Sequence, residues 1–338
     1  MAGVTTHQRA VPGAAADSSA GSPGGSEIAV STDSYAKWTV SAIESLQEWY
    51  GEDQGLWLST NWWNAANCLT VLGDFLEIGG SSAEDLNLAD VFSNTFTQAQ
   101  KSSPTTSKTL INRHNDLRTV ESHYGQSSET KLVKRGYRGF INDYYDDEGW
   151  WALAWIRAYD VMGNPEYLAM AEHIFYDMKG GLANATCGGG IWWNKQRSEK
   201  NAIANELYLS VAASLANRAY HPEAYLAIAK AQWAWFQRSG MINNQNLIND
   251  GLRIYTNGTC VNNGKNTWSY TQGVILGGLV ELYKATGDST FLSKAVDIAE
   301  AAISALSIDG ILHDSCKPNF VASLKGAYLH WANRSPRH

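Results

Sequence analysis

Two kinds of helical segment alternate along this chain from about residue 33 onward, and the alternation restricts the fold more than any other feature. Segments of the first kind, such as Ala202–Asn217 and Tyr270–Ala285, are small and apolar on every side. Segments of the second kind, such as Pro222–Arg238, carry apolar residues on one face only. An all-round apolar helix must be buried, whereas an amphipathic helix keeps one face in water. The repeat of about 50–65 residues therefore predicts helical hairpins that form an inner ring and an outer ring, an all-α toroid.

Five helix pairs are predicted in this way. The outer helices begin near residues 35, 85, 165, 222 and 289, and the inner helices near residues 62, 146, 202, 270 and 323. Gly287 is expected to end an inner helix in the left-handed conformation, and Pro165 to begin an outer helix. Residues 101–145 are polar, and we expect a long loop there with a hairpin near residues 132–142. Because the longer loops precede the inner helices, the N-terminal ends of these helices are expected to converge on one cavity.

Composition disfavours several classes of function. The chain of 338 residues has a net charge of −7, with 17% charged and 44% hydrophobic residues. The negative charge disfavours nucleic acid and anionic membrane surfaces, and the apolar content supports a sizeable core. No apolar run reaches the ~20 residues that span a bilayer. The eight histidines form no cluster with metal-ligand spacing. We therefore expect no metal, no cofactor, no nucleic-acid partner and no membrane span, and we expect a monomer.

The cysteines and the N-terminal segment bear on the compartment. The four cysteines lie far apart without a CxxC motif: Cys68, Cys187, Cys260 and Cys316. In an oxidising compartment they allow two disulfides in three connectivities. Glycosylation sequons begin at Asn184, Asn257 and Asn333, which suits a secreted protein. Residues 1–30 are rich in Ala, Gly and Ser and lack the apolar core of a signal peptide, so we expect a disordered tail there.

An acidic pair opens the second predicted inner helix. Asp146 and Asp147 stand between Tyr145 and the pair Trp150 and Trp151. Adjacent residues lie about 100° apart around a helix, and a helix N-terminus favours carboxylates. Aromatic neighbours raise the pKa of whichever carboxyl is more buried, so one carboxyl can be ionised while the other is protonated. Such a pair suits glycoside hydrolysis by a nucleophile and an acid/base, but simple capping of the helix is an equally good explanation of the spacing.

Aromatic and amide side chains gather near the starts of the predicted inner helices. Tryptophan accounts for 14 residues, six of them in Trp-Trp pairs, and flat amphipathic rings suit the faces of sugars. The candidate sugar-binding rings are Trp62, Trp63, Tyr145, Trp192, Trp193, Trp268 and Tyr270. The candidate sugar-binding amides are Asn67, Asn201, Asn205 and Gln272. Each group has an alternative role, because rings can pack beneath loops and amides can cap or bridge helices.

Five segments of the chain carry a specific pattern. They are Asp146–Gly163 (DDEGWWALAWIRAYDVMG), Asn61–Asn67 (NWWNAAN), Cys187–Trp193 (CGGGIWW), Lys200–Glu206 (KNAIANE) and Tyr270–Tyr283 (YTQGVILGGLVELY). This pattern closely resembles glycoside hydrolase family 76, the endo-α-1,6-mannanases, from about residue 33 to the C-terminus, and in its fungal type. The resemblance implies an (α/α)6 toroidal catalytic domain over residues 31–338 and an extracellular or cell-wall enzyme. It further implies retaining endo-hydrolysis of α-1,6-mannosidic bonds in mannan, with Asp146 as the nucleophile and Asp147 as the acid/base.

The chain departs from the family pattern near its C-terminus. A six-pair toroid needs twelve helices, and the pattern supplies ten, with residues 323–333 as the last inner helix. We therefore expect the last helix pair to be missing, the ring to be open and its stability to be reduced.

Two alternatives to hydrolysis remain open. The first is a cell-wall mannan transglycosylase, which would use the same acidic pair and pass the glycan to a sugar hydroxyl in place of water. The second is a catalytically silent toroid that only binds glycans.

Overall fold

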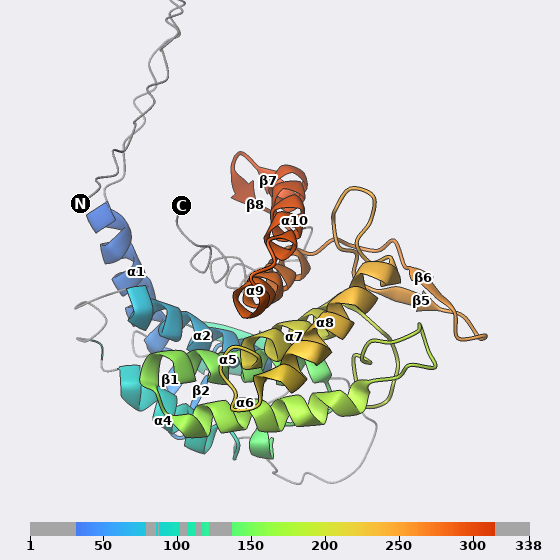
Figure 1. Cartoon of the computed structure of the whole chain (residues 1–338). Coiled ribbons are helices and arrows are strands. Elements are labelled where there is room, and N and C mark those ends of the chain that lie inside the picture. Colours follow the sequence, from blue (N-terminus) through green and yellow to red (C-terminus); the bar gives the residue numbers. More distant parts are fainter. Residues whose placement is uncertain are drawn as a thin grey trace, which may run out of the picture.

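The computed structural model describes residues 32–78, 86, 88–101, 107–111, 117–121 and 137–314. For residues 32–34, 107–111 and 117–121 it describes the backbone only. Nine α-helices lie within these ranges, and most of them form two layers (Figure 1). The inner helices are α2 (Trp62–Ile78), α5 (Tyr145–Met162), α7 (Ala202–Leu215) and α9 (Ser269–Thr286). The outer helices are α4 (Leu88–Gln98), α6 (Pro165–Met178), α8 (Pro222–Ser239) and α10 (Thr290–Leu306), and α1 (Thr32–Gln47) precedes them at the N-terminal end.

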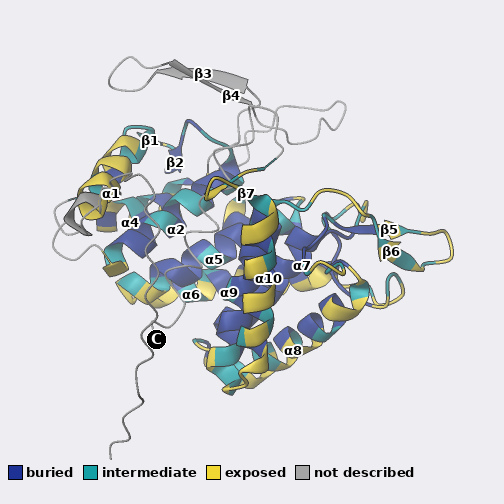
Figure 2. Cartoon of the chain, turned by 90° about the horizontal axis from the view of Figure 1, so that it is seen from above, coloured by how far each residue is buried: buried dark blue, intermediate teal, exposed yellow. Residues whose placement is uncertain are grey.

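The inner helices follow one another side by side, in the order α2, α5, α7 and α9. Helices α6, α8 and α10 pack behind α5, α7 and α9, respectively. All residues of α7 are buried, whereas α8 keeps one side exposed to solvent (Figure 2). The predicted all-α toroid of inner and outer helices is therefore confirmed for the described helices. The predicted fifth inner helix at residues 323–333, the missing last pair and the disordered tail at residues 1–30 fall outside the described residues.

Local sequence signals explain where these helices begin and end. Helices α6 and α8 each have proline at the first position, where the missing N–H costs nothing. Gly163 and Gly287 end α5 and α9 in the left-handed conformation, with φ of 68° and 72°. Each of these glycines donates its backbone N–H to a carbonyl of the preceding turn. The predictions for Pro165 and Gly287 are confirmed.

The strands of the protein are short antiparallel pairs in the loops. They are β1 (Tyr50–Gly51) with β2 (Leu56–Trp57), β3 (Ser107–Ile111) with β4 (Leu117–Glu121), β5 (Leu252–Ile254) with β6 (Cys260–Asn262), and β7 (Ser307–Ile308) with β8 (Ile311–Leu312). The hairpin predicted near residues 132–142 is wrong in its described part. Residues Arg138–Phe140 form a 3-10 turn, and the positive φ of Gly139 and Phe140 interrupts the extended backbone that a strand would need. The hairpin of this long connection is β3–β4, earlier in the chain.

Buried arginines join neighbouring inner helices near their C-terminal ends. Arg157 on α5 pairs with Asp74 on α2 at 2.7 Å. Arg218, just after α7, pairs with Asp160 on α5 at 2.6 Å and with Glu281 on α9 at 2.8 Å. For the buried pair Arg157–Asp74, removing one partner costs about 3–5 kcal/mol, because the other charge is left uncompensated, whereas the pair with the exposed Asp160 contributes less. These pairs therefore hold the inner row together at the face opposite to the helix N-termini.

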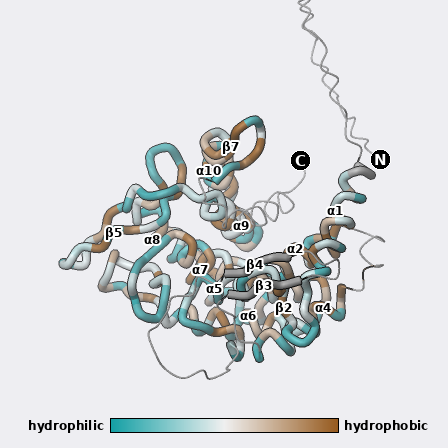
Figure 3. The backbone as a smooth tube through the Cα atoms, turned by 180° about the vertical axis from the view of Figure 1, so that it is seen from behind, coloured by the Kyte–Doolittle hydropathy of each residue, from teal (hydrophilic) through white to brown (hydrophobic). Residues whose placement is uncertain are grey.

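The surface of the described part is polar in its loops, and the apolar residues concentrate along the helices. Figure 3 shows mainly hydrophilic colours in the loops beyond β5 and α8. None of the described helices is both long enough and apolar enough to cross a lipid bilayer.

Two adjacent glycines on α9 offer a test of the inner-helix packing. A Cβ on Gly278 would lie 2.7 Å from Oγ of Ser210 and 3.3 Å from its Cα on α7, whereas a Cβ on Gly277 would meet nothing within 4 Å. We expect Gly278→Ala to lower the melting temperature, since overpacking costs about 1–3 kcal/mol. Gly277→Ala is the matched control and should leave stability unchanged or raise it by up to ~1 kcal/mol through helix propensity. Equal melting temperatures for the two variants would contradict the close α7–α9 contact.

Candidate functional site

The N-terminal ends of α5, α7 and α9 meet at one face of the inner row. The loops before these helices are tied to the helix starts by backbone bonds: Tyr145 N–H donates to the Trp193 carbonyl at 2.9 Å, and Ala202 N–H donates to the Asp250 carbonyl at 2.8 Å. Burial raises the pKa of Tyr270, and the negative charges of Asp250 and Asp146 raise it further, because both carboxylates lie near its hydroxyl. The predicted convergence of helix starts is therefore present in the described part, and it forms the candidate site.

Asp146 lies in the first turn of α5 with its side chain half-buried. Its Oδ1 atom is buried and accepts no hydrogen bond from the described residues. Burial raises the pKa of Asp146 to about 6, a hydrogen bond from the Trp193 side chain acts in the opposite direction, and the charge of Glu199 raises the pKa further. A carboxyl with this pKa can be protonated or ionised close to neutral pH, as proton-transfer chemistry requires.

Asp147 lies beside Asp146 but has a different environment. Its side chain is 4% exposed, and its Oδ2 accepts a hydrogen bond from Nδ2 of Asn142 at 2.5 Å. The orientation of this amide is fixed, because Oδ1 of Asn142 accepts the backbone N–H of Tyr144 at 2.9 Å. A donor aimed at a carboxyl favours its ionised form. The two neighbouring carboxyls therefore meet different donors, the Trp193 side chain at Asp146 and the Asn142 amide at Asp147.

Glu148 supports this pair from inside the protein. Its side chain is fully buried, and its Oε1 accepts the backbone N–H of Asn142 at 3.1 Å and pairs with Nζ of Lys195 at 3.0 Å. Lys195 also pairs with Asp177 on α6 at 2.8 Å. Burial raises the pKa of Glu148 to about 9, with the ammonium of Lys195 opposing the shift. A chain of contacts thus runs from an outer helix through Lys195, Glu148 and Asn142 to the carboxyl of Asp147.

The predicted sugar-binding rings divide into two groups. Trp63, Trp193, Trp268 and Tyr270 are half-buried. Trp63 stacks against Trp150 with 6.0 Å between ring centroids, Trp193 lies 4.9 Å from Tyr144, and Trp268 lies parallel to Tyr270 at 6.4 Å. These rings keep accessible surface close to the starts of α2, α5 and α9.

The other three rings are buried beneath the loops. Trp62 is 2% exposed and packs against Tyr137 and Trp151. Trp192 lies under the ammonium of Lys200, 5.1 Å from its ring centroid. Tyr145 is buried against the backbone at Gly181. For these three side chains, the structure matches the alternative role of packing rather than a place at an open surface.

The predicted amides serve mainly as braces between loops and helices. On α7, the amide of Asn205 accepts the backbone N–H of Ile191 at 2.8 Å and donates to the carbonyl of the same residue at 3.0 Å. On α9, Gln272 makes the same pair of bonds with Ile248, at 2.8 and 2.9 Å. Both side chains are fully buried. The same device thus fastens the preceding loop to two successive inner helices, as the bridging alternative predicted.

The remaining two amides act within their own helices. Asn201 caps α7, with its Oδ1 accepting the backbone N–H of Ala204 at 3.2 Å. Asn67 donates to the Trp63 carbonyl at 3.5 Å, one turn earlier on α2, and its side chain is half-buried.

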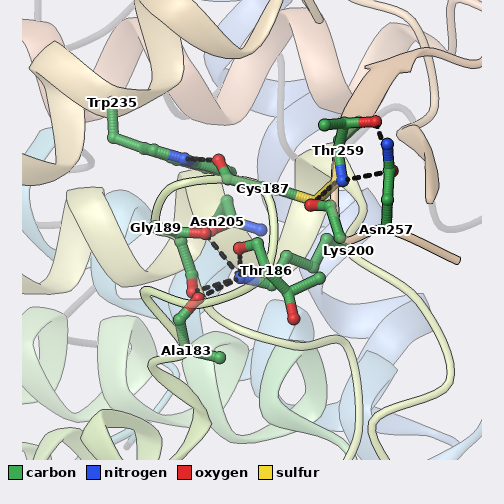
Figure 4. Close-up of a disulfide and its surroundings, with 12 residues drawn as sticks. Ala183, Thr186, Cys187, Gly189, Lys200, Asn205, Trp235, Asn257 and Thr259 are labelled. Atoms are coloured by element: carbon green, nitrogen blue, oxygen red, sulfur yellow. Dashed lines mark hydrogen bonds between the residues drawn. A yellow bond between two sulfur atoms is a disulfide. The ribbon is translucent and has the colours of Figure 1, made fainter. Parts of the chain in front are cut away.

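A disulfide and a buried lysine organise the loop between α6 and α7 (Figure 4). Cys187 is bonded to Cys260 on β6, with a Cα–Cα distance of 5.1 Å, and this selects among the connectivities that the sequence left open. Cys316 lies outside the described residues, so the pairing of the remaining two cysteines is not described. Nζ of Lys200 donates to four backbone carbonyls, those of Ala183, Thr186, Gly189 and Gly190, at 2.5 to 3.1 Å. The Lys200 ammonium therefore supplies hydrogen bonds that backbone N–H groups would give to these carbonyls in a helix or a sheet.

Sequence reasoning missed several side chains that shape the site. Asn142 and Glu148 stand next to the acidic pair, but nothing in their spacing indicated a bond to Asp147. Glu199 and Asp250 lie in loops before α7 and α9, where the only available signal was their position ahead of an inner-helix start. No group of three or more His, Cys, Asp or Glu side chains that could hold a metal ion occurs among the described residues.

Comparison with known proteins places this geometry in a family. Residues 28–334 match the family described as Glycosyl hydrolase family 76. Mannan endo-1,6-alpha-mannosidase DFG5 of Candida albicans is 27% identical over 302 residues, which cover 84% of this chain and 60% of that protein. Mannan endo-1,6-alpha-mannosidase DCW1 of the same organism is 31% identical over 170 residues, 46% of this chain and 37% of that protein. The chain thus spans less than two thirds of these relatives.

Solved structures share the fold. The GH76A alpha-1,6-mannanase from Salegentibacter sp. HEL1_6 superposes with a TM-score of 0.63 at 21% identity, covering 82% of this chain and 73% of that chain. Dfg5 from Chaetomium thermophilum, in complex with glucosamine, superposes with a TM-score of 0.60 at 16% identity, covering 84% and 67%. These likenesses agree with the (α/α)6 class that the family resemblance implies and with the inner and outer rings predicted from the alternating helices.

The indole of Trp193 offers a test of the electrostatics at Asp146. Trp193→Phe removes the hydrogen bond that favours the ionised carboxyl, so we expect the pKa of Asp146 to rise above about 6, by about 1. Carboxyl 13C NMR titration measures this change directly.

The matched control for this experiment is Trp268→Phe. Nε1 of Trp268 donates to Oδ1 of Asp250 at 3.0 Å, so this variant removes an indole donor from a different carboxyl. Its titration of Asp146 should follow that of the wild type. A wild-type titration of Asp146 in the Trp193→Phe protein would show that the indole does not stabilise this carboxylate.

Proposed function

The chain belongs to glycosyl hydrolase family 76, and from this premise we propose that it is a retaining endo-hydrolase of α-1,6-mannosidic bonds in mannan or mannose-rich glycans. The observation that carries the proposal is the pair Asp146 and Asp147 at the start of an inner helix, in two different environments. Burial raises the pKa of Asp146 to about 6, whereas Asn142 donates to Asp147. Two adjacent carboxyls in different environments are what a glycosidase needs in order to hold one proton between them.

The proposed reaction has two steps. In the first, one carboxylate attacks the anomeric carbon and forms a glycosyl ester, while the other carboxyl gives its proton to the departing oxygen. In the second step, the residue that gave its proton is now a carboxylate, and it takes a proton from water. The water oxygen attacks the anomeric carbon, which breaks the ester and releases the sugar. Both carboxyls end in their starting states, and no cofactor is required.

We propose the roles that the resemblance implies, with Asp146 as the nucleophile and Asp147 as the acid/base. One observation favours the opposite order. In the ligand-free protein burial raises the pKa of Asp146 to about 6, as suits a residue that gives and takes a proton near neutral pH. The experiment that assigns the roles must therefore read the reaction itself rather than a proton affinity.

The half-buried rings supply surfaces for the sugars on either side of the cleaved bond. Trp193 bonds to Asp146 and lies against Tyr144, so a sugar ring that reaches the carboxyl passes its indole. Trp63 with Trp150, and Trp268 with Tyr270, form stacked pairs near the starts of α2 and α9. We assign sugar stacking to these accessible rings and a supporting role to the buried ones.

Features of the loops support a location outside the cell or in the cell wall. The Cys187–Cys260 disulfide requires an oxidising compartment to form. The sequon asparagines Asn184 and Asn257 are both exposed, as a glycan attachment site must be. We propose that the protein acts there as a monomer on the mannan of the wall.

Incubation with α-1,6-mannan tests the activity. We expect the wild type to release oligomannosides, and the single variants Asp146→Asn and Asp147→Asn to lose at least ~10³-fold in rate, because each removes one of the two chemical groups. Lys230→Ala, on the exposed side of outer helix α8, is the control and should keep full activity. Mass spectrometry of the products decides between the alternatives: longer glycans than the substrate would show transglycosylation, and unchanged mannan would leave only glycan binding.

Azide rescue assigns the roles of the two carboxyls. Azide replaces the missing carboxylate in Asp146→Ala, and in Asp147→Ala it replaces the water that attacks the glycosyl ester. If Asp146 is the nucleophile, Asp146→Ala should form a β-mannosyl azide by a single inversion, and Asp147→Ala should form an α-mannosyl azide through the glycosyl ester. NMR of the anomeric proton distinguishes the two products. The reverse pattern would give the nucleophile role to Asp147.

A further inference from the structure

A cavity lies between the start of α7 and the hairpin β5–β6. Its volume is about 210 Å³, which is below the ~300–1,000 Å³ of pockets for drug-sized ligands and suits a single sugar ring. The lining residues are Glu199, Lys200, Gly251, Leu252, Arg253, Asn263 and Lys265. The lining therefore combines the charged residues Glu199, Arg253 and Lys265 with the amide residue Asn263 and the apolar Leu252, whereas the Lys200 ammonium is bound to backbone carbonyls.

This cavity adjoins the proposed reaction centre through Glu199. The Glu199 carboxylate lines the cavity, and its charge also raises the pKa of Asp146. The backbone carbonyl of Glu199 accepts the N–H of Trp193 at 2.8 Å, and the indole of Trp193 bonds to Asp146. A glycan held at Asp146 thus has a neighbouring cavity within reach along the start of α7.

The walls of the cavity are held rigidly. The Asp250–Leu252 segment is tied to α7, because Leu252 N–H donates to the Lys200 carbonyl at 3.0 Å and Gly251 pairs with Asn201 as a β-bridge. The other strand of the hairpin carries Cys260, whose disulfide to Cys187 connects it to the loop around the Lys200 ammonium (Figure 4). A wall fixed on both sides is preorganised, so binding there costs little ordering of the protein.

The charges around the cavity favour a neutral ligand with many hydroxyls. Arg253 and Lys265 are positive and exposed. Burial raises the pKa of Glu199 and the charge of Asp250 raises it further, while Lys265 and a hydrogen bond from Asn201 act in the opposite direction. An anion would meet the Glu199 carboxyl, and a cation would meet Arg253 and Lys265. Sugar hydroxyls both donate and accept hydrogen bonds, so they can satisfy both kinds of partner.

We propose that this cavity is a distal subsite that binds one further mannose residue of the glycan, with Arg253 and Asn263 as its recognition residues. The inference rests on the proposed function. The subsite would make binding depend on chain length and so favour cleavage within a chain over removal of terminal sugars.

Calorimetric titration of an α-1,6-mannooligosaccharide series tests the proposal. The parent is the full chain with Asp146→Asn and Asp147→Asn, titrated with mannobiose through mannopentaose. We expect Kd to fall about tenfold when the oligosaccharide gains the mannose residue that reaches the cavity, the worth of one or two charge-assisted hydrogen bonds. Arg253→Ala and Asn263→Ala should each reduce this gain in affinity at least threefold. Lys230→Ala on α8 is the matched control and should retain the full gain. Thermal melts of all variants verify that they are folded.

The outcomes separate this proposal from the function on which it rests. If the parent binds no oligosaccharide of the series, the mannan substrate is wrong and the subsite falls with it. If affinity increases with chain length and the step survives in both Arg253→Ala and Asn263→Ala, only the subsite is overturned. Inorganic phosphate is titrated as a second probe: phosphate that competes with mannopentaose but not with mannobiose would assign the cavity to anions and would also overturn the proposal.

Discussion

Two buried amides, Asn205 and Gln272, make the bonds on which the geometry of the site depends. Each amide accepts the backbone N–H and donates to the backbone carbonyl of one loop residue, Ile191 or Ile248. A mainly apolar inner helix has few polar side chains with which to hold an irregular loop, and a buried backbone group without a partner costs free energy. The amides solve both problems at once, and they bring the loops that carry Trp193 and the Asp250 region to the helix starts.

The environment of the acidic pair follows from this arrangement. The loop held by Asn205 brings the indole of Trp193 to Asp146, and the first turn of α5 places Asp147 against Asn142. Two carboxyls that are adjacent in sequence thereby come to differ in burial and in hydrogen bonding. The cavity beside Glu199 belongs to the same framework, because its walls are the loop ends that the disulfide and Lys200 hold in place.

The part of the fold that could be predicted is the part governed by local periodicity. The apolar character of Ala202–Leu215 and the amphipathic character of Pro222–Ser239 indicated their inner and outer places, and proline and glycine signals indicated helix ends. The hairpin in the long connection was misplaced, since short strands in a polar loop carry little periodic signal. The role of Asn142 was not predictable either, because its bond to Asp147 depends on how the backbone turns between them.

The sequence by itself determined which helices are buried, where the acidic pair stands and which family the chain resembles. These properties reside in residue types and short spacings, which the sequence displays directly. Only the tertiary structure decided which rings remain accessible, that Asn205 and Gln272 act as braces, and that Cys187 pairs with Cys260. The reason is that burial, hydrogen bonding and disulfide pairing depend on distances between residues far apart in the chain. Such distances exist only once the helices have packed.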